Sequence, residues 1–333
     1  MTAAVLSVED LKVHFRIDAG GMFRHDYRTI RAVDGLSFQV HRAETLGVVG
    51  ESGCGKSTLA RAILGLVRPV SGKVVWLGED LTRLDDETLR KKRRELQLIF
   101  QDPLGSLDPR MTVGQIIAEP LKTFYPSMSR MQVRERVSGM LKMVGLLPDQ
   151  INRYPHEFSG GQCQRIGIAR ALVVNPRLVV CDEPVSALDV SIQAQIVNLL
   201  KDLQQKLQLS LIFIAHDLSV VRHVSDRVLV MYLGKIMEVA DRESIYHASR
   251  HPYTRALIES VPIPDPAAER ARARRSLEGD LPSATNPPSG CVFRTRCPYA
   301  IDRCAVEVPG LEMLDSGNQV ACIRHRELAG QFV

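Results

Sequence analysis

Gly50-Glu-Ser-Gly-Cys-Gly-Lys-Ser57 fits the phosphate-loop pattern G-x-x-x-x-G-K-[ST], and the residues on either side suit that loop. Before it, Thr45-Leu-Gly-Val-Val49 has the pattern of a short buried strand. After it, residues 57–64 carry apolar side chains at helical spacing. A glycine-rich turn between a strand and a helix directs backbone N–H groups and the positive end of the helix dipole at one point, where a polyphosphate can bind. The stretch therefore predicts an α/β fold with a nucleotide site.

The side chains of this loop suit a nucleotide that carries magnesium. Lys56 is expected to reach the outer phosphates, and the Ser57 hydroxyl is expected to bind Mg²⁺. The alternative is a glycine-rich turn with a chance lysine, which the flanking strand and helix disfavour. The residues expected at the nucleotide are Gly50, Ser52, Gly53, Cys54, Gly55, Lys56, Ser57 and Thr58.

Two adjacent carboxylates are candidates for the metal and water chemistry. Leu178-Val-Val-Cys181 is apolar throughout, which predicts a central parallel strand buried on both faces. Asp182 and Glu183 follow at its carboxyl end, where paired charges are costly unless a cation or a catalytic task compensates them. We expect Asp182 to bind Mg²⁺ through water and Glu183 to polarise the attacking water. The alternative, a solvated acidic loop, fits poorly with the apolar run before it.

A second apolar run, Leu211-Ile-Phe-Ile-Ala215, delivers His216 to the same edge of the predicted sheet. A single histidine is more often structural than catalytic. Its position at a strand terminus favours a contact with the γ-phosphate, so His216 is a candidate for stabilising the transition state.

Three further segments occur around these strands: Gln101, Ser159-Gly-Gly-Gln162 after Phe158, and Ser186-Ala-Leu-Asp189. With them the chain resembles the ATP-binding subunits of ABC transporters, from about residue 5 to residue 260. The resemblance implies a P-loop NTPase core of the RecA-like kind, with an antiparallel β subdomain and a helical subdomain inserted at about residues 103–172. It also implies that Gln101 contacts Mg²⁺, senses the γ-phosphate and couples it to a permease.

The resemblance further implies a nucleotide site shared by two chains. The helix end formed by Ser159, Gly160, Gly161 and Gln162 would face the ATP held by a second ATPase subunit. Bare N–H groups at a helix N-terminus suit that contact. Taken alone, the segment could equally be a glycine C-cap or a turn. Asp189 is a further nucleotide contact by the same resemblance.

The residue that stacks on adenine is less sharply marked. The resemblance places Phe15 there, Tyr27 is the rival, and either aromatic ring could instead belong to the core. Residues 19–26 have the composition of a loop inserted between two edge strands.

Composition and charge exclude several classes of protein. In 333 residues the hydrophobic content is 45%, the charged content 24% and the formal net charge +5, which is ordinary for a globular chain and gives no case for nucleic acid. Arg90-Lys-Lys-Arg-Arg94 is expected to be a solvated helix face, with a membrane surface as the alternative. No run approaches the ~20 apolar residues of a membrane span, and the first ten residues do not resemble a signal peptide. A transport function therefore needs a pore made by other chains.

The middle of the chain is predicted to be helical. Helices are expected at about 111–121, at 131–144 and after Gly161, and prolines punctuate them. These prolines are Pro103, Pro109, Pro120 and Pro148.

The character of the chain changes after about residue 260. Six of its 18 prolines fall between residues 261 and 290, which predicts a linker with one short exposed helix at 269–275. Four cysteines follow within some thirty residues, and in a cytosolic protein such a group favours metal over disulfides. Their spacing alone does not choose between zinc and an iron–sulfur cluster. They are Cys291, Cys297, Cys304 and Cys322.

A second resemblance bears on this region. His251-Pro-Tyr-Thr254 and the segment from Gly290 to Ala300 resemble the C-terminal part of ABC ATPases that serve dipeptide and oligopeptide importers. That resemblance implies a [4Fe–4S] cluster on the four cysteines, with zinc and reduced free thiols as the alternatives. The chain then divides into an ATP-binding cassette at 1–260, a proline-rich linker at 261–290 and a cysteine-rich region at 291–333.

Together these features predict an ATPase subunit that energises peptide import at the cytoplasmic face of a bacterial inner membrane. The expected partners are a second, related ATPase chain, two transmembrane permease subunits and, indirectly, a periplasmic or lipid-anchored peptide-binding protein. An importer of nickel or glutathione is the alternative within transport. A soluble ABC ATPase outside transport is the alternative beyond it, but such proteins carry a long coiled coil or two cassettes, and this chain has neither pattern.

Overall fold

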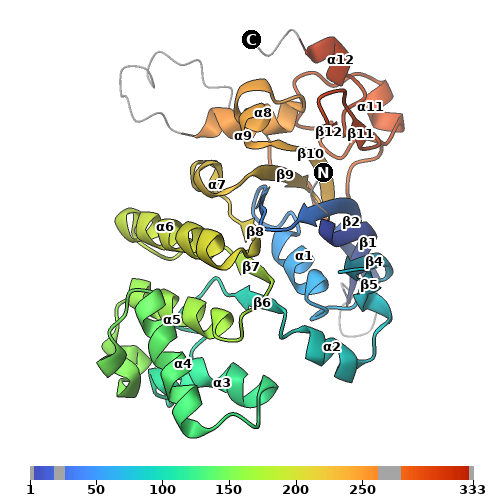
Figure 1. The fold of residues 1–333 in the computed structure, drawn as a ribbon. Helices are drawn as coiled ribbons and strands as arrows, with labels where there is room; N and C mark the ends of the chain where they lie inside the picture. The colour runs from blue at the N-terminus through green and yellow to red at the C-terminus, as the bar shows by residue number, and fades with distance from the viewer. Residues whose placement is uncertain (1–3, 19–26, 262–278, 330–333) are drawn as a thin grey trace, which may run out of the picture.

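The computed structural model describes residues 4–18, 27–261 and 279–329, and it contains two sheets (Figure 1). The smaller sheet is antiparallel, in the order β2-β1-β4-β5. Its strands are β1 (Ala4–Asp18), β2 (Tyr27–His41), β4 (Ser71–Trp76) and β5 (Glu79–Asp80). The predictions for residues 19–26 and 269–275 lie outside the described residues.

The larger sheet has the order β11-β12-β10-β9-β3-β8-β7-β6, and its five strands from β9 to β6 run parallel. Those strands are β3 (Thr45–Val49), β6 (Leu96–Ile99), β7 (Leu178–Asp182), β8 (Ser210–Ile214) and β9 (Arg227–Tyr232). Three antiparallel strands extend it, namely β10 (Lys235–Asp241), β11 (Glu312–Met313) and β12 (Gln319–Val320). The three apolar runs predicted as strands are β3, β7 and β8.

Each face of the larger sheet has its own hydrophobic core. Side chains alternate along a strand, so Val48 joins the core under the antiparallel sheet and α1 (Lys56–Ile63), while Val49 joins the core under the other helices. All residues of β3, β7 and β8 are buried. Burial on both faces explains why these strands are continuous apolar runs rather than alternating ones.

A group of helices lies beyond β6 and β7, at the far end of the molecule from the C-terminal region (Figure 1). It consists of α3 (Val113–Phe124), α4 (Arg130–Met143) and α5 (Gly160–Leu172), which contact one another. Thr112 and Ser129 are the N-cap residues of α3 and α4, and each forms a capping box. The hydroxyl accepts the backbone N–H of a glutamine three residues later, and the side chain of that glutamine accepts the backbone N–H of the N-cap residue. The predicted helices are therefore present, although their ends differ by a few residues.

The sequence placed Pro120 at the end of a helix of about residues 111–121. In the structure α3 continues through Pro120 to Phe124. Proline removes one backbone hydrogen bond. The buried side chains of Ile116, Ile117 and Leu121 keep the helix packed on either side of that gap.

The remaining helices connect the strands or belong to the C-terminal region. They are α2 (Asp86–Lys92), α6 (Val190–Leu207), α7 (Leu218–Val224), α8 (Arg242–Ala248), α9 (Pro252–Ser260), α11 (Arg303–Val306) and α12 (His325–Leu328). Within the described ranges, no helix is both long enough and apolar enough to cross a membrane.

Candidate active site

The phosphate loop joins β3 to α1 and is built around Lys56. This lysine is 4% exposed, and its Nζ donates to the backbone oxygens of Gly50 (2.8 Å) and Glu51 (3.0 Å). Gly55 has φ 106°, and a Cβ there would lie 1.9 Å from the Ala32 oxygen, so only glycine fits. The loop therefore has the closed turn and the central cation that a polyphosphate site needs.

Ser57 and Asp182 meet at the carboxyl edge of the larger sheet. The Ser57 hydroxyl donates to Asp182 Oδ1 over 2.8 Å, and Asp182 is 8% exposed. Burial, the strongest influence, raises the pKa of the Asp182 carboxyl; the Ser57 bond opposes this rise and the charge of Glu183 adds to it. Two hard oxygen ligands in contact, one of them poorly solvated, suit a divalent cation.

Glu183 begins the turn after β7 in a left-handed conformation, with φ 46°. A left-handed backbone at a glutamate is unusual and tends to persist at functional sites. Gln101 Nε2 donates to Glu183 Oε2 over 3.0 Å, so the two side chains predicted to act on one phosphate are in contact. Glu183 and His216 also line one small cavity of about 50 Å³, together with Ser186 and Gln193.

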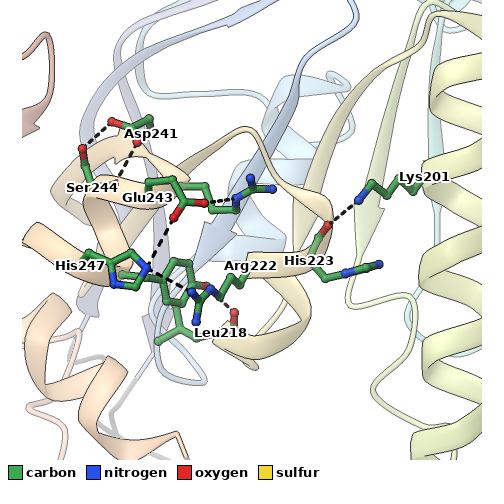
Figure 2. Close-up of polar contacts among 10 residues, drawn as sticks. Lys201, Leu218, Arg222, His223, Asp241, Glu243, Ser244 and His247 are labelled. Carbon is green, nitrogen blue, oxygen red and sulfur yellow. Dashed lines mark hydrogen bonds and ion pairs between the residues drawn. The ribbon is translucent and has the colours of Figure 1, made fainter.

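The helix that follows His216, α7, is bonded to α8. The Leu218 oxygen accepts a short hydrogen bond from the Tyr246 hydroxyl, and the Arg222 guanidinium stacks over the Tyr246 ring at 5.1 Å. Figure 2 shows Arg222 directed at His247 on α8, and these two residues are 3.2 Å apart. The loop that carries His216 is therefore anchored to α8 through α7.

Ser159 begins α5 with a capping box, so this segment is a helix N-terminus and not the glycine C-cap that was its alternative. Gln162 N–H donates to the Ser159 hydroxyl over 3.4 Å, and Ser159 N–H donates to Gln162 Oε1 over 3.0 Å. Ser159 is exposed, whereas Gly161 is buried against Ile192 of α6. Because α5 packs among the helical group, its exposed end is available to another chain.

The other predicted contacts lie on open surface. Asp189 is the N-cap residue of α6, yet its side chain makes no capping bond and is exposed. Phe15 and Tyr27 are 39% and 64% exposed and lie on the adjacent strands β1 and β2. Both rings are accessible to a base, so the choice between them stays a prediction.

The four C-terminal cysteines line one cavity of about 20 Å³, together with His251 and Phe293. All seven cysteines, which lie within the described residues, are free thiols. Burial raises the pKa of the Cys297 thiol to about 12 and that of Cys322 to about 11, and the neighbouring cysteines add to the rise. In the part of the chain that the structure describes, no group of three or more metal-ligating side chains is placed to hold a metal ion, so the cluster and zinc predictions gain no support from this placement.

Sequence reasoning missed two residues that touch the phosphate loop. Tyr253 of the His-Pro-Tyr-Thr motif accepts the Glu51 N–H over 3.0 Å, and Arg296 contacts the Glu51 carboxylate. The motif itself was a usable signal, but only the folded chain shows which loop it reaches.

Comparison with known proteins agrees with the fold. Residues 33–186 match the family model of the ABC transporter, and residues 237–304 match that of the oligopeptide/dipeptide transporter, C-terminal region. The oligopeptide transport ATP-binding proteins OppF of Salmonella typhimurium and Escherichia coli are each 62% identical over 309 residues, which is 92% of this chain and 92% of theirs. OppF of Haemophilus influenzae is 57% identical over 96% of this chain and 97% of its own length.

Solved structures show the same architecture. The ATP-binding cassette MJ0796, in a dimeric post-hydrolysis state bound to ADP and Pi, has a TM-score of 0.64 and 29% identity, over 71% of this chain and 98% of that one. The CbiO1 protein of Clostridium perfringens, part of the ABC transporter complex CbiONQ, has a TM-score of 0.62 and 26% identity, over 73% of this chain and 90% of that one. The chain therefore belongs to the ATP-binding proteins of the ABC transporter family, in the oligopeptide transport group.

Proposed function

We propose that this chain is the ATP-hydrolysing subunit that energises oligopeptide import. The observation that carries the proposal is the convergence of Lys56, Ser57, Asp182, Glu183 and Gln101 at one edge of the larger sheet, in a chain 57–62% identical to OppF proteins. The function of those relatives, as their names give it, is oligopeptide transport. An importer of nickel or glutathione would use the same ATP chemistry, so the cargo is the part that experiment must decide.

The chemistry that we propose is phosphoryl transfer to water. Lys56 and the loop N–H groups bind the phosphates. Ser57 and Asp182 would hold Mg²⁺, which would supply positive charge against the negative charge that develops on the phosphate oxygens. Glu183 accepts the proton of the attacking water. Gln101 fixes the Glu183 carboxylate through the 3.0 Å hydrogen bond, and His216, which lines the same small cavity as Glu183, contacts the γ-phosphate.

The second half of each ATP site belongs to another chain in this proposal. Ser159 and Gly160 lie at the N-terminus of α5, where Ser159 is exposed, and Asp189 presents an exposed carboxylate without a capping bond at the start of α6. Positive helix ends attract phosphate. The dimeric state of the MJ0796 cassette supports the arrangement, and a related ATPase subunit of the same importer is the partner that we propose.

We also propose the domain boundaries, the membrane partners and the location of the chain. The cassette occupies about residues 1–260, with the helical subdomain at 103–172, a linker at 261–290 and the cysteine-rich region at 291–333. Two permease subunits dock on the cassette pair at the cytoplasmic face of the inner membrane, and a peptide-binding protein delivers cargo from outside. This chain would supply energy and no cargo site.

The proposal is tested by reconstitution. The chain is purified with its partner ATPase and the permease subunits in lipid vesicles, and ATP turnover is measured with and without a peptide-loaded binding protein. Peptide-dependent turnover that Glu183→Gln abolishes supports the function. Turnover stimulated by nickel or glutathione, and by no peptide, assigns the cargo to the alternative. An assembly without ATP turnover contradicts the proposal.

We also propose that the four C-terminal cysteines hold a [4Fe–4S] cluster, with zinc as the alternative. Their thiols surround one cavity, which supports a shared ligand. One zinc ion needs all four sulfurs at about 2.3 Å from a single point, whereas each cysteine of a cluster binds a different iron atom.

Metal analysis distinguishes these outcomes without any activity assay. The chain is purified without oxygen, and its iron, acid-labile sulfide and zinc contents are measured. About four irons and four sulfides per chain, lost in Cys297→Ser, support the cluster. One zinc supports the alternative, and the absence of both metals contradicts a metal site.

A further inference from the structure

Arg296 lies between two of the C-terminal cysteines, Cys291 and Cys297, and reaches into the phosphate loop. Its Nη1 donates to both carboxylate oxygens of Glu51, each at 2.9 Å, although the two residues are 245 positions apart. The Arg296 side chain is only 7% exposed and that of Glu51 is 26% exposed. An ion pair this sheltered from water is worth more than a surface pair, and losing one partner leaves a poorly solvated charge.

Glu51 is held both from inside the loop, where its carbonyl also accepts the Cys54 N–H over 3.2 Å, and from outside it. Its N–H donates to the Tyr253 hydroxyl over 3.0 Å, its carbonyl accepts Lys56 Nζ over 3.0 Å, and its side chain accepts Arg296. Two of these contacts come from the C-terminal part of the chain. The start of the phosphate loop is therefore positioned from outside the nucleotide-binding core.

The turn that carries Arg296 is itself well supported. The Arg296 guanidinium lies 6.0 Å from the centre of the Tyr232 ring, and the Arg296 backbone N–H donates to the Phe293 backbone oxygen over 3.0 Å. Phe293 packs edge-on against Tyr232 at 5.3 Å and lies 5.2 Å from the ring of Tyr253. These three aromatic rings, all fully buried, connect the cysteine-bearing turn to β9 and α9.

The electrostatic consequence concerns the ligand of the loop. A triphosphate carries several negative charges, and an uncompensated carboxylate on the second residue of its cradle would repel it. Arg296 neutralises that carboxylate and also fixes where it points. Lys56 cannot serve both purposes, since its ammonium is needed at the phosphates.

We propose that Arg296 is a positioning residue of the nucleotide site, acting through Glu51, and that it makes ATP affinity depend on the fold of the four-cysteine segment. The proposal rests on the proposed function, because it concerns the affinity of the same ATP site. It extends that function by naming a regulatory input, the structural state of the segment around Cys291 and Cys297.

A rescue experiment tests the proposal. Binding of a fluorescent ATP analogue with Mg²⁺ is measured for the unchanged chain, for Arg296→Met, for Glu51→Gln and for the double variant. Arg296→Met is expected to raise Kd roughly tenfold, a typical size for coupling between sites. The double variant is expected to return to within about threefold of the unchanged chain, because the repelling carboxylate is gone.

Arg303→Met is the matched control, since it removes an exposed Arg303–Glu307 pair from the same C-terminal region. It is expected to leave Kd unchanged. In the reconstituted assembly, Arg296→Met should raise KM for ATP while kcat changes less than about twofold, because the chemistry at Glu183 is untouched. A residue that served only the fold would change both constants and would not be rescued by Glu51→Gln.

A second measurement needs no variant and applies even if Arg296→Met fails to fold. Coupling is reciprocal, so MgATP should slow hydrogen exchange of residues 291–297 in the unchanged chain, while residues 130–143 of α4 serve as the internal reference. Unchanged exchange at 291–297 overturns the proposal, and so does a double variant as weak as Arg296→Met. If the unchanged chain does not bind ATP at all, the proposed function fails instead.

Discussion

The Ser57 hydroxyl donates a hydrogen bond of 2.8 Å to Asp182 Oδ1, although 125 positions separate the two residues. The bond joins the start of α1 to the end of β7 and brings together the two side chains proposed to bind Mg²⁺. Because these strands and helices are fixed by packing on both faces of the larger sheet, the ligands are in place before the metal arrives.

Ser57→Ala should therefore weaken the response of the enzyme to magnesium. The variant loses one metal ligand and leaves the buried Asp182 carboxylate without its donor, so we expect the Mg²⁺ concentration for half-maximal ATP turnover to rise at least about tenfold. The measurement is ATP turnover against Mg²⁺ concentration in the reconstituted assembly. Ser57→Thr keeps the hydroxyl and is expected to remain close to the unchanged enzyme; equal defects in both variants would contradict a ligand role.

Glu183→Gln should separate binding from chemistry. The amide keeps the size of the side chain but cannot accept a proton, so turnover is expected to fall by about 10² to 10⁴. ATP binding and ATP-dependent pairing of the two ATPase chains should persist, as measured by equilibrium binding and by sedimentation. Glu87→Gln, which changes an exposed glutamate paired with Lys91, is the control. Hydrolysis retained by Glu183→Gln would reject this residue as the base.

Gly161→Ala should destabilise the chain through a clash between two helices. An added Cβ would lie 2.5 Å from Ile192 Cγ2, and a β-branched side chain in a helix has little freedom to move away. The expected loss is about 1–3 kcal/mol of unfolding free energy. Gly167 lies in the same helix with open space at its Cβ position, so Gly167→Ala is expected to gain up to about 1 kcal/mol. Denaturant titration of both variants measures their unfolding free energies. Equal changes in the two variants would contradict the packing argument.

Glu238 should make stability fall as the pH rises. Burial raises the pKa of its carboxyl from 4.5 to about 7, although the N–H groups of Arg250 and His251 bond to it. Between these two pH values the folded chain binds more protons than the unfolded chain, so stability decreases with pH and levels off above 7. The difference corresponds to about 3 kcal/mol for this residue.

Thermal unfolding of the unchanged chain and of Glu238→Gln, followed from pH 5 to pH 8, isolates this contribution. The glutamine cannot titrate, so its unfolding temperature should vary less across that interval, and the unfolding temperature of the unchanged chain should fall relative to that of Glu238→Gln as the pH rises. Parallel curves for the two proteins would show that Glu238 is charged throughout.

The nucleotide site was predictable because each of its parts is local in sequence. Lys56 and Ser57 begin α1 directly after the glycine-rich turn, Asp182 ends the apolar strand β7, and His216 comes shortly after the apolar strand β8. Parallel strands bring their carboxyl ends to one edge of the sheet. The contact between Glu51 and Arg296 has no such rule behind it. It depends on how the aromatic rings of β9, α9 and the C-terminal turn pack, which no local pattern encodes.

The helical group shows the same division. Residues 111–121 and 131–144 carry apolar periodicity, and the observed helices differ from those ranges by only a few residues. Pro120 was misjudged because its local cost is outweighed by burial of its neighbours, which is a tertiary effect. The pairing of β12 with β10 was missed because a strand of two residues leaves almost no trace in a sequence.

The pairing of β12 with β10 protects the larger sheet from adding strands of other molecules at that edge. Glu238 and Val239 of β10 would otherwise offer unpaired N–H and C=O groups at the rim of a large sheet, where strands of other molecules can add. Val320 pairs with Glu238, and Gln319 pairs with Val239. Val320 lies two residues before Cys322. Unfolding of the cysteine segment would thus expose the edge of β10 and favour aggregation, in addition to the loss of ATP affinity proposed above. The same exposed edge would mark the unfolded chain for quality control in the cell.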